Sequence, residues 1–124
     1  MRVSDLDTIN NYRVATRYLG SKSERKLAHN TTIRRQGGDI IVRYYETDIV
    51  TYHPDGRITL RDGGYSTATT IKRLHAMTPS GVRVRRKAIR DTCEGRSYIC
   101  GHVTAVRVPG DLERRIVGAL TINA

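Results

Sequence analysis

The sequence predicts an α+β domain with a mostly antiparallel sheet: a meander of about four strands over residues 31–61, one helix over about 67–77, and further strands in the C-terminal third. Three observations support this prediction. Apolar and polar residues alternate with a period of two from Thr31 onward. Glycine-containing turns separate the alternating runs, and helical spacing interrupts them only once. At 124 residues, the chain is expected to form a single domain, residues 1–124.

The N-terminal residues are the least patterned part of the chain. Residues 1–22 are predicted to form a polar, flexible lead-in. A short helix is expected over residues 23–30, SERKLAHN, because Ser23 can cap it and Leu27 and Ala28 would both face inward.

The first predicted hairpin joins TTIRR to DIIVRYY through Gly37-Gly38. Two consecutive glycines suit a type I′ turn, in which both central residues need a positive φ. A polar turn around Glu46-Thr47 then leads into the next strand.

The second predicted hairpin joins DIVTYH to RITLR through Pro54-Asp55-Gly56, which is typical of a three-residue loop with a glycine bulge. This turn predicts that Tyr52 lies opposite Ile58 and His53 opposite Arg57. The core face should then consist of Val50, Tyr52, Ile58 and Leu60, and the other face of Thr51, His53, Arg57 and Thr59.

A helix is predicted after Asp62-Gly63-Gly64, with Ser66, Thr67 or Thr69 as the N-cap and a stop at Pro79. Its apolar stripe is expected to consist of Ile71, Leu74 and Met77, or of Leu74, His75 and Met77.

Two more strands are predicted, from GVRVRRK and SYICGHVTAVRV, in residues 81–87 and 97–108. The tail, DLERRIVGAL, fits either a short helix capped by Asp111 or a final strand, and its pattern leaves both open.

Positive charge is concentrated in one segment of a chain whose formal net charge is +10. Residues 71–90 contain seven cationic side chains and no acidic one: Lys72, Arg73, Arg83, Arg85, Arg86, Lys87 and Arg90. Arg83 and Arg85 are expected on one exposed strand face, and Arg86, Lys87 and Arg90 in a loop. Such a cluster favours a surface that contacts a polyanion. A solvated face that aids solubility remains the alternative.

The run LGSKSERKLAHNT and the run DIVTYHPDGRITLRDGGYSTATTIKRL are similar to a family of small proteins from phages of actinobacteria. The similarity covers roughly residues 18–86, and family members often have Trp where this chain has Tyr65. The resemblance implies a phage protein that acts in the host cytoplasm. The family has no established activity, so the resemblance implies no catalytic residue.

Other motifs predict neither a catalytic centre nor a metal or cofactor site. His53 near Asp55 lacks a third partner, and Asp55 is explained by its turn. The spacing of Cys93, Cys100 and His102 does not match a common zinc site. Both cysteines are expected as free thiols, with Cys100 buried as a small apolar residue. Gly63-Gly64 matches no phosphate-binding motif.

These observations predict a non-enzymatic phage accessory protein that binds DNA or RNA through the basic residues, without base-specific readout. Tyr65 and Tyr98 can add base stacking. The alternative is docking on an acidic host protein, through the same basic residues or a sheet edge. An enzyme is disfavoured because no nucleophile is paired with a base. No membrane span is expected, and an unpaired outer strand would permit a homodimer.

Overall fold

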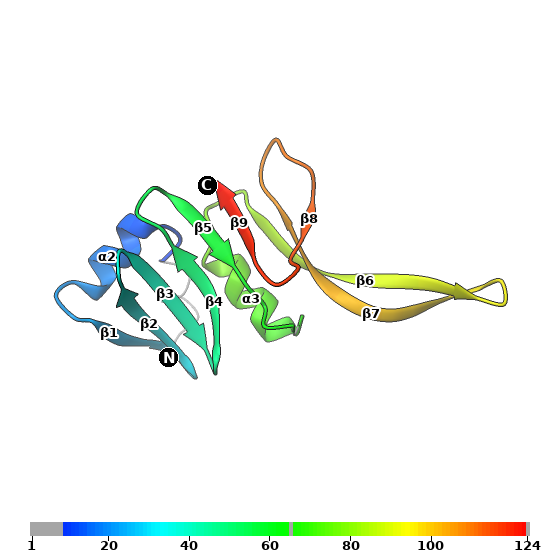
Figure 1. Cartoon of the computed structure of the whole chain (residues 1–124), viewed down its shortest axis with the longest axis horizontal. Coiled ribbons are helices and arrows are strands. Elements are labelled where there is room, and N and C mark those ends of the chain that lie inside the picture. The colour runs from blue at the N-terminus through cyan, green and yellow to red at the C-terminus, as the bar shows by residue number, and fades with distance from the viewer. Residues whose placement is uncertain (1–8, 65, 124) are drawn as a thin grey trace.

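The computed structural model describes residues 9–64 and 66–123, which form two antiparallel sheets and two helices (Figure 1). The larger sheet has the strand order β1-β2-β3-β4-β5-β9, with bounds Glu24–Ala28, Thr31–Gln36, Asp39–Tyr44, Thr47–Tyr52, Arg57–Leu60 and Leu120–Asn123. The smaller sheet has the order β6-β7-β8, with bounds Arg83–Cys93, Arg96–Arg107 and Arg114–Arg115. The helices are α2, Tyr12–Leu19, and α3, Ala68–Ala76. The predicted α+β class is therefore confirmed, although the helix count and several strands differ from the prediction.

The predicted four-strand meander is present as β2, β3, β4 and β5. Tyr52 pairs with Ile58, and the Arg57 carbonyl accepts a hydrogen bond of 2.9 Å from the His53 N–H, as the turn chemistry requires. The predicted core face is buried, since Val50, Tyr52, Ile58 and Leu60 are at most 2% exposed. Local turn chemistry therefore fixes the register of this hairpin.

The Gly37-Gly38 turn has the predicted length but not the predicted type. Gln36 pairs with Asp39, so the loop has two residues. Gly37 has a φ of 60°, whereas Gly38 does not have a positive φ. A type I′ turn needs both, so that prediction is wrong. Gly38 instead lies against the next hairpin, because a Cβ there would be 3.4 Å from Cγ of Pro54.

The helix predicted over residues 23–30 is wrong, because Glu24–Ala28 form the edge strand β1. An irregularity in the β1–β2 pairing falls between Lys26 and Ala28. It lets Leu27 and Ala28 both be buried, at 0% and 4% exposed, although strict alternation would expose one of them. Pairing with β2 satisfies the backbone of this segment and outweighs its local helical pattern.

Helix α2 lies within the segment expected to be a flexible lead-in, and the sequence pattern does not predict it. Asn11 caps the helix by accepting a hydrogen bond of 2.9 Å from the Val14 N–H, and Ala15 and Leu19 are buried. The first part of the predicted lead-in, residues 1–8, lies outside the described residues.

Helix α3 confirms the helix predicted over about 67–77. Thr67 is the N-cap and accepts a hydrogen bond from the Thr70 N–H. Leu74 and Met77 are fully buried. The helix also joins the two sheets, because the Val84 N–H of β6 donates to Nδ1 of His75 at 3.2 Å.

A single hydrophobic cluster connects the sheets, and Val84, Val106 and Ile116 of the smaller sheet region belong to it. Tyr52 helps to fill this core in a chain without Phe or Trp. Its buried hydroxyl lies 2.5 Å from the carbonyl oxygen of Met77, which satisfies the polar end of an aromatic core residue.

The β6–β7 hairpin, residues 83–107, projects from the rest of the molecule, and we call it the arm (Figure 1). It is buried only near its base, at Val84 and from Thr104 to Val106, and residues 90–100 are all exposed. Its tip is the two-residue turn Glu94-Gly95, with φ values of 51° and 78°. The loop predicted from Arg86 is wrong, because β6 continues to Cys93.

The tail adopts the strand alternative that the sequence left open, as the short strands β8 and β9. Strand β9 returns to the larger sheet, where Ile122 pairs with Ile58 and is 1% exposed. Across the described residues, no helix is long and apolar enough to cross a membrane.

Candidate functional site

The seven predicted cationic site residues are divided between helix α3 and the arm. Lys72 and Arg73 lie on α3, and the other five lie on β6. The Arg73 guanidinium lies 4.2 Å from the centre of the Tyr44 ring, and its Nε donates to Thr31 Oγ1 at 3.2 Å. Arg73 therefore contacts the larger sheet and is not part of a surface on the arm.

Strand alternation places the five cations of β6 on two opposite faces of the arm. Arg83, Arg85 and Lys87 share one face, which we call the paired face. Arg86 and Arg90 share the other, which we call the open face, together with the opposing residues His102 and Ile99. The cations are therefore close in sequence and separated in space.

On the paired face, Glu113 binds two of the predicted residues. Arg85 donates to its carboxylate through Nε at 2.8 Å and Nη2 at 3.1 Å, and Lys87 donates through Nζ at 3.1 Å. These hydrogen bonds, from Arg85 first and then Lys87, lower the pKa of Glu113 to about 2. One carboxylate thus partly compensates two of the seven predicted charges.

On the open face, the cations lack such compensation. Arg86 donates through Nη2 to Nδ1 of His102 at 3.2 Å, and this hydrogen bond holds its guanidinium on the open face. Among the described residues, no carboxylate forms an ion pair with Arg86 or Arg90. The open face is therefore the part of the predicted site that is available to an anionic partner.

The fold adds cations that the count over residues 71–90 did not include. Residues 83–107 contain seven cationic and two acidic side chains, because β7 contributes Arg96 and Arg107. Arg107 lies directly opposite Arg83. Both arginines of β7 reach the arm through the turn at Glu94-Gly95, where both residues have a positive φ. Glu-Gly is not one of the usual signals for such a turn, which are Asn-Gly, Asp-Gly and Gly-Gly. Tyr98 is 46% exposed on the arm, whereas Tyr65 lies outside the described residues.

The two cysteines also lie on the arm, and both are exposed free thiols. The predicted burial of Cys100 is wrong, because residues 90–100 of the arm are all exposed and no layer covers them. The pairing also shifts between Ile89 and Arg90, so that Cys100 has no direct partner. Its Sγ donates instead to the Ile89 carbonyl at 3.4 Å. In the described part of the chain, no group of three or more His, Cys, Asp or Glu residues is arranged to hold a metal.

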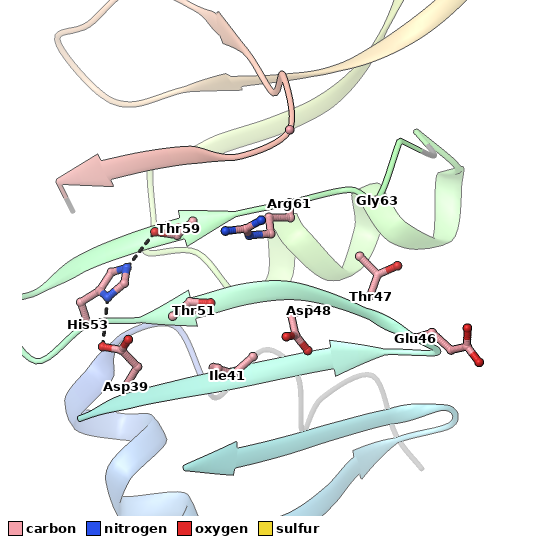
Figure 2. A pocket seen from close by; sticks show the side chains of 11 residues that line it. Asp39, Ile41, Glu46, Thr47, Asp48, Thr51, His53, Thr59, Arg61 and Gly63 are labelled. Atoms are coloured by element: carbon pink, nitrogen blue, oxygen red, sulfur yellow. Dashed lines mark hydrogen bonds and ion pairs between the residues drawn. The ribbon is translucent and has the colours of Figure 1, made fainter. Parts of the chain in front are cut away.

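A second candidate site lies on the face of the larger sheet opposite the core, in a groove of about 610 Å³ (Figure 2). His53 and Asp39 lie at one end of this groove, and Glu46 and Thr47 lie at the other (Figure 2). Nδ1 of His53 is 3.0 Å from Oδ1 of Asp39, and its Nε2 is 2.7 Å from Oγ1 of Thr59. Figure 2 shows the three side chains in a continuous chain across neighbouring strands.

The structure gives His53 a carboxylate partner that sequence analysis did not identify. Asp55, its neighbour in sequence, caps its own turn by accepting a hydrogen bond of 3.0 Å from the Arg57 N–H. The β3–β4 register would have identified Asp39 as this partner, because Ile40 pairs with Tyr52 and the pairing places Asp39 beside His53. That register is not readable from turn chemistry alone.

One comparison with known proteins gives a match. A family model described as the Kyanoviridae Gp96 protein matches residues 12–96, from the start of α2 to the first residue of β7. No curated protein and no solved structure matches the chain.

Proposed function

The chain belongs to the Kyanoviridae Gp96 family of phage proteins, and we propose that it binds nucleic acid in the cytoplasm of the infected host through the open face of its arm. The binding involves no chemical step and no base-specific readout. A phage of actinobacteria as the source is part of this proposal, and the resemblance of residues 18–86 supports it.

The observation that carries this proposal is the arm itself. A two-stranded ribbon without a covering layer is marginally stable alone, so a long one is best explained by a partner. The major groove of duplex DNA, about 12 Å wide, admits a two-stranded β-ribbon, whereas the major groove of duplex RNA is too narrow. The excess of cations over acids on residues 83–107 supports an anionic partner, and duplex DNA fits both features.

The open face has a spacing that suits this partner. Arg86 and Arg90 are four residues apart on one strand, which corresponds to about 13 Å. This distance is close to the width of the major groove, so the two guanidinium groups can reach phosphates on both backbones. Thr92 lies further along the same face and offers a hydroxyl.

Two matched double variants test the proposal. Arg86→Ala/Arg90→Ala and Arg85→Ala/Lys87→Ala remove the same formal charge from the same strand. We expect the first to weaken binding to a random-sequence duplex by about tenfold or more, because each arginine forms charge-assisted bonds to phosphate. It should also reduce the slope of log affinity against log salt by about 2. The second should weaken binding by less than about threefold, since Glu113 already binds both side chains.

Fluorescence anisotropy at several salt concentrations measures both quantities, and circular dichroism checks that each variant is folded. Equal losses in the two variants would show that only total charge matters. Full retention of binding by the Arg86/Arg90 variant would refute the open face as the contact surface.

An acidic host protein is a second candidate partner, and the unpaired outer edge of β6 favours it. An extended segment can add to such an edge by main-chain hydrogen bonds. Ile99 and Tyr98, at 50% and 46% exposed, would supply apolar contacts beside it. A host protein that co-purifies after nuclease treatment, with no retention on DNA, would select this candidate.

A further inference from the structure

We propose that the groove on the larger sheet is an acyl-transfer site, in which His53 activates the Thr59 hydroxyl to attack a small polar carboxylic ester. This site lies on a different sheet from the arm, and the proposal does not depend on nucleic-acid binding. It rests on the hydrogen-bonded chain of Asp39, His53 and Thr59.

The three side chains have the order of an orienting carboxylate, a base and a nucleophile. Asp39 begins β3, His53 directly follows β4, and Thr59 is central in β5. The two distances that join them, 3.0 Å and 2.7 Å, are both within hydrogen-bonding range. Adjacent strands of a sheet hold the groups, so their relative positions are fixed by main-chain pairing.

When His53 is neutral, the donors and acceptors around its ring determine which atoms carry the protons. An ionised Asp39 only accepts, so Nδ1 of His53 must carry the ring proton. Nε2 then has a free lone pair and must accept the proton of the Thr59 hydroxyl. Thr121, whose Oγ1 lies 2.9 Å from that of Thr59, therefore donates to the Thr59 oxygen. This tautomer is the one that a general base needs.

All three side chains line the groove, and Thr59, at 9% exposed, is buried beside the more accessible His53 and Asp39. The side chains of His53 and Asp39 are 23% and 39% exposed, so the base is reachable from solvent. Arg61 lies two residues from Thr59 on the same strand face and lines the same groove (Figure 2). Its guanidinium supplies positive charge where a carbonyl oxygen becomes negative. Arg34 holds the nearby Asp48 at 2.9 Å, so this carboxylate is already engaged.

The reaction needs only an ester and water. Oγ1 of Thr59 bonds to the carbonyl carbon while its proton passes to Nε2 of His53. The bond from that carbon to the alcohol oxygen then breaks, and His53 returns the proton to the departing oxygen. Water then attacks the acyl carbon while His53 takes one of its protons. The bond from that carbon to the Thr59 oxygen breaks, and His53 gives the proton to this oxygen, which releases the carboxylic acid and free Thr59.

The test uses 4-nitrophenyl acetate and follows nitrophenolate release together with mass spectrometry of the intact protein. We expect Thr59→Val and His53→Gln each to slow hydrolysis by about 100-fold, the range of a lost nucleophile or base. The matched control is Thr32→Val, because Thr32 lies on β2 of the same sheet but is not among the residues that line the groove. It should hydrolyse within twofold of the wild type. Thr59→Ser should keep activity.

The site of acylation decides the outcome. An acetyl group on the peptide that contains Thr59, absent from His53→Gln, supports the proposal. Wild-type rates in Thr59→Val, or acetylation confined to lysines, would overturn it. Thermal melting of each variant shows whether a loss reflects unfolding, and Thr59→Ser keeps the test valid if Thr59→Val does not fold. Neither result changes the expectation for the arm.

Discussion

At the scale of single residues, Glu113 decides which cations of the arm are available. It lies just before β8 and bonds to Arg85 and Lys87 on β6, the far strand of the same sheet. Ala105 of the intervening β7 lies opposite Arg85, and its small side chain leaves space for a carboxylate to cross the sheet. The small side chain of Ala105 therefore allows Glu113 to contact both Arg85 and Lys87.

The ion pairs of Glu113 predict a specific dependence of stability on pH. Its pKa is lowered in the folded protein, from 4.5 to about 2, so the pairs stabilise the fold fully above pH 4.5. This contribution should decrease as the pH falls from 4.5 toward 2, because protonation of Glu113 removes its charge. Glu113→Gln should therefore melt below the wild type at pH 6, and the two melting temperatures should converge near pH 2.

A matched variant separates this effect from general charge. Glu46 is exposed and forms no ion pair among the described residues, so Glu46→Gln removes the same charge without breaking a pair. Thermal melts at pH 6, 4 and 2.5 compare the three proteins. A constant difference between the wild type and Glu113→Gln at all three values would contradict the role of the pairs.

The residue scale also shows where prediction from sequence ends. Turn chemistry at Pro54-Asp55-Gly56 placed His53 and Thr59 on the same face, and this was confirmed. It did not place Asp39 beside them, because that depends on the β3–β4 pairing. A shift between Val42 and Arg43, and a positive φ of 54° at Tyr45, set that register. Neither feature has a glycine or proline to mark it.

At the scale of elements, the arm and the larger sheet are stabilised differently. Strands of the larger sheet bury side chains against α2 and α3, whereas the distal part of the arm has hydrogen-bonded pairs and exposed side chains. Sequence alternation predicted that β6 and β7 exist. It placed β7 to within one residue at each end, at 97–108 against the observed Arg96–Arg107. It ended β6 at Lys87 instead of Cys93, because a strand exposed on both faces has no apolar period to mark its extent.

Removing the distal arm should therefore leave the fold intact. Ala88 and His102 are directly paired, so residues 89–101 can be replaced by Asn-Gly, a sequence suited to a two-residue turn. We expect the free energy of unfolding in urea to change by no more than about 1 kcal/mol, since the removed side chains do not belong to the core. Affinity for duplex DNA should fall below that of the wild type, because the replacement removes Arg90, although it retains Arg86.

Urea unfolding and anisotropy on the same preparation give both values. A shortened protein that loses cooperative unfolding would show that the arm is part of the folding unit. A shortened protein that binds DNA as well as the wild type would show that the base of the arm, near Arg83 and Arg107, is the contact surface instead.

At the scale of the whole molecule, the question is whether the net charge of +10 or the position of a few charges governs binding. Helix α2 lies at the opposite end of the molecule from the arm (Figure 1). Its Arg13 and Arg17 are exposed, and neither side chain makes a hydrogen bond or ion pair within the described residues. Arg13→Ala/Arg17→Ala removes two positive charges, which lowers the formal net charge from +10 to +8, as does Arg86→Ala/Arg90→Ala.

The two variants should differ in a way that depends on salt. At 0.15 M salt the Debye length is about 8 Å, so charges on α2 are screened from a duplex at the arm, and the α2 variant should lose less than about threefold in affinity. At 0.01 M salt the Debye length is about 30 Å, and the α2 variant should weaken as well. The arm variant should lose affinity at both concentrations, because its arginines contact phosphates directly. Anisotropy titrations at the two salt concentrations measure the four values, and equal losses for both variants at 0.15 M would show that duplex DNA does not bind preferentially at the arm.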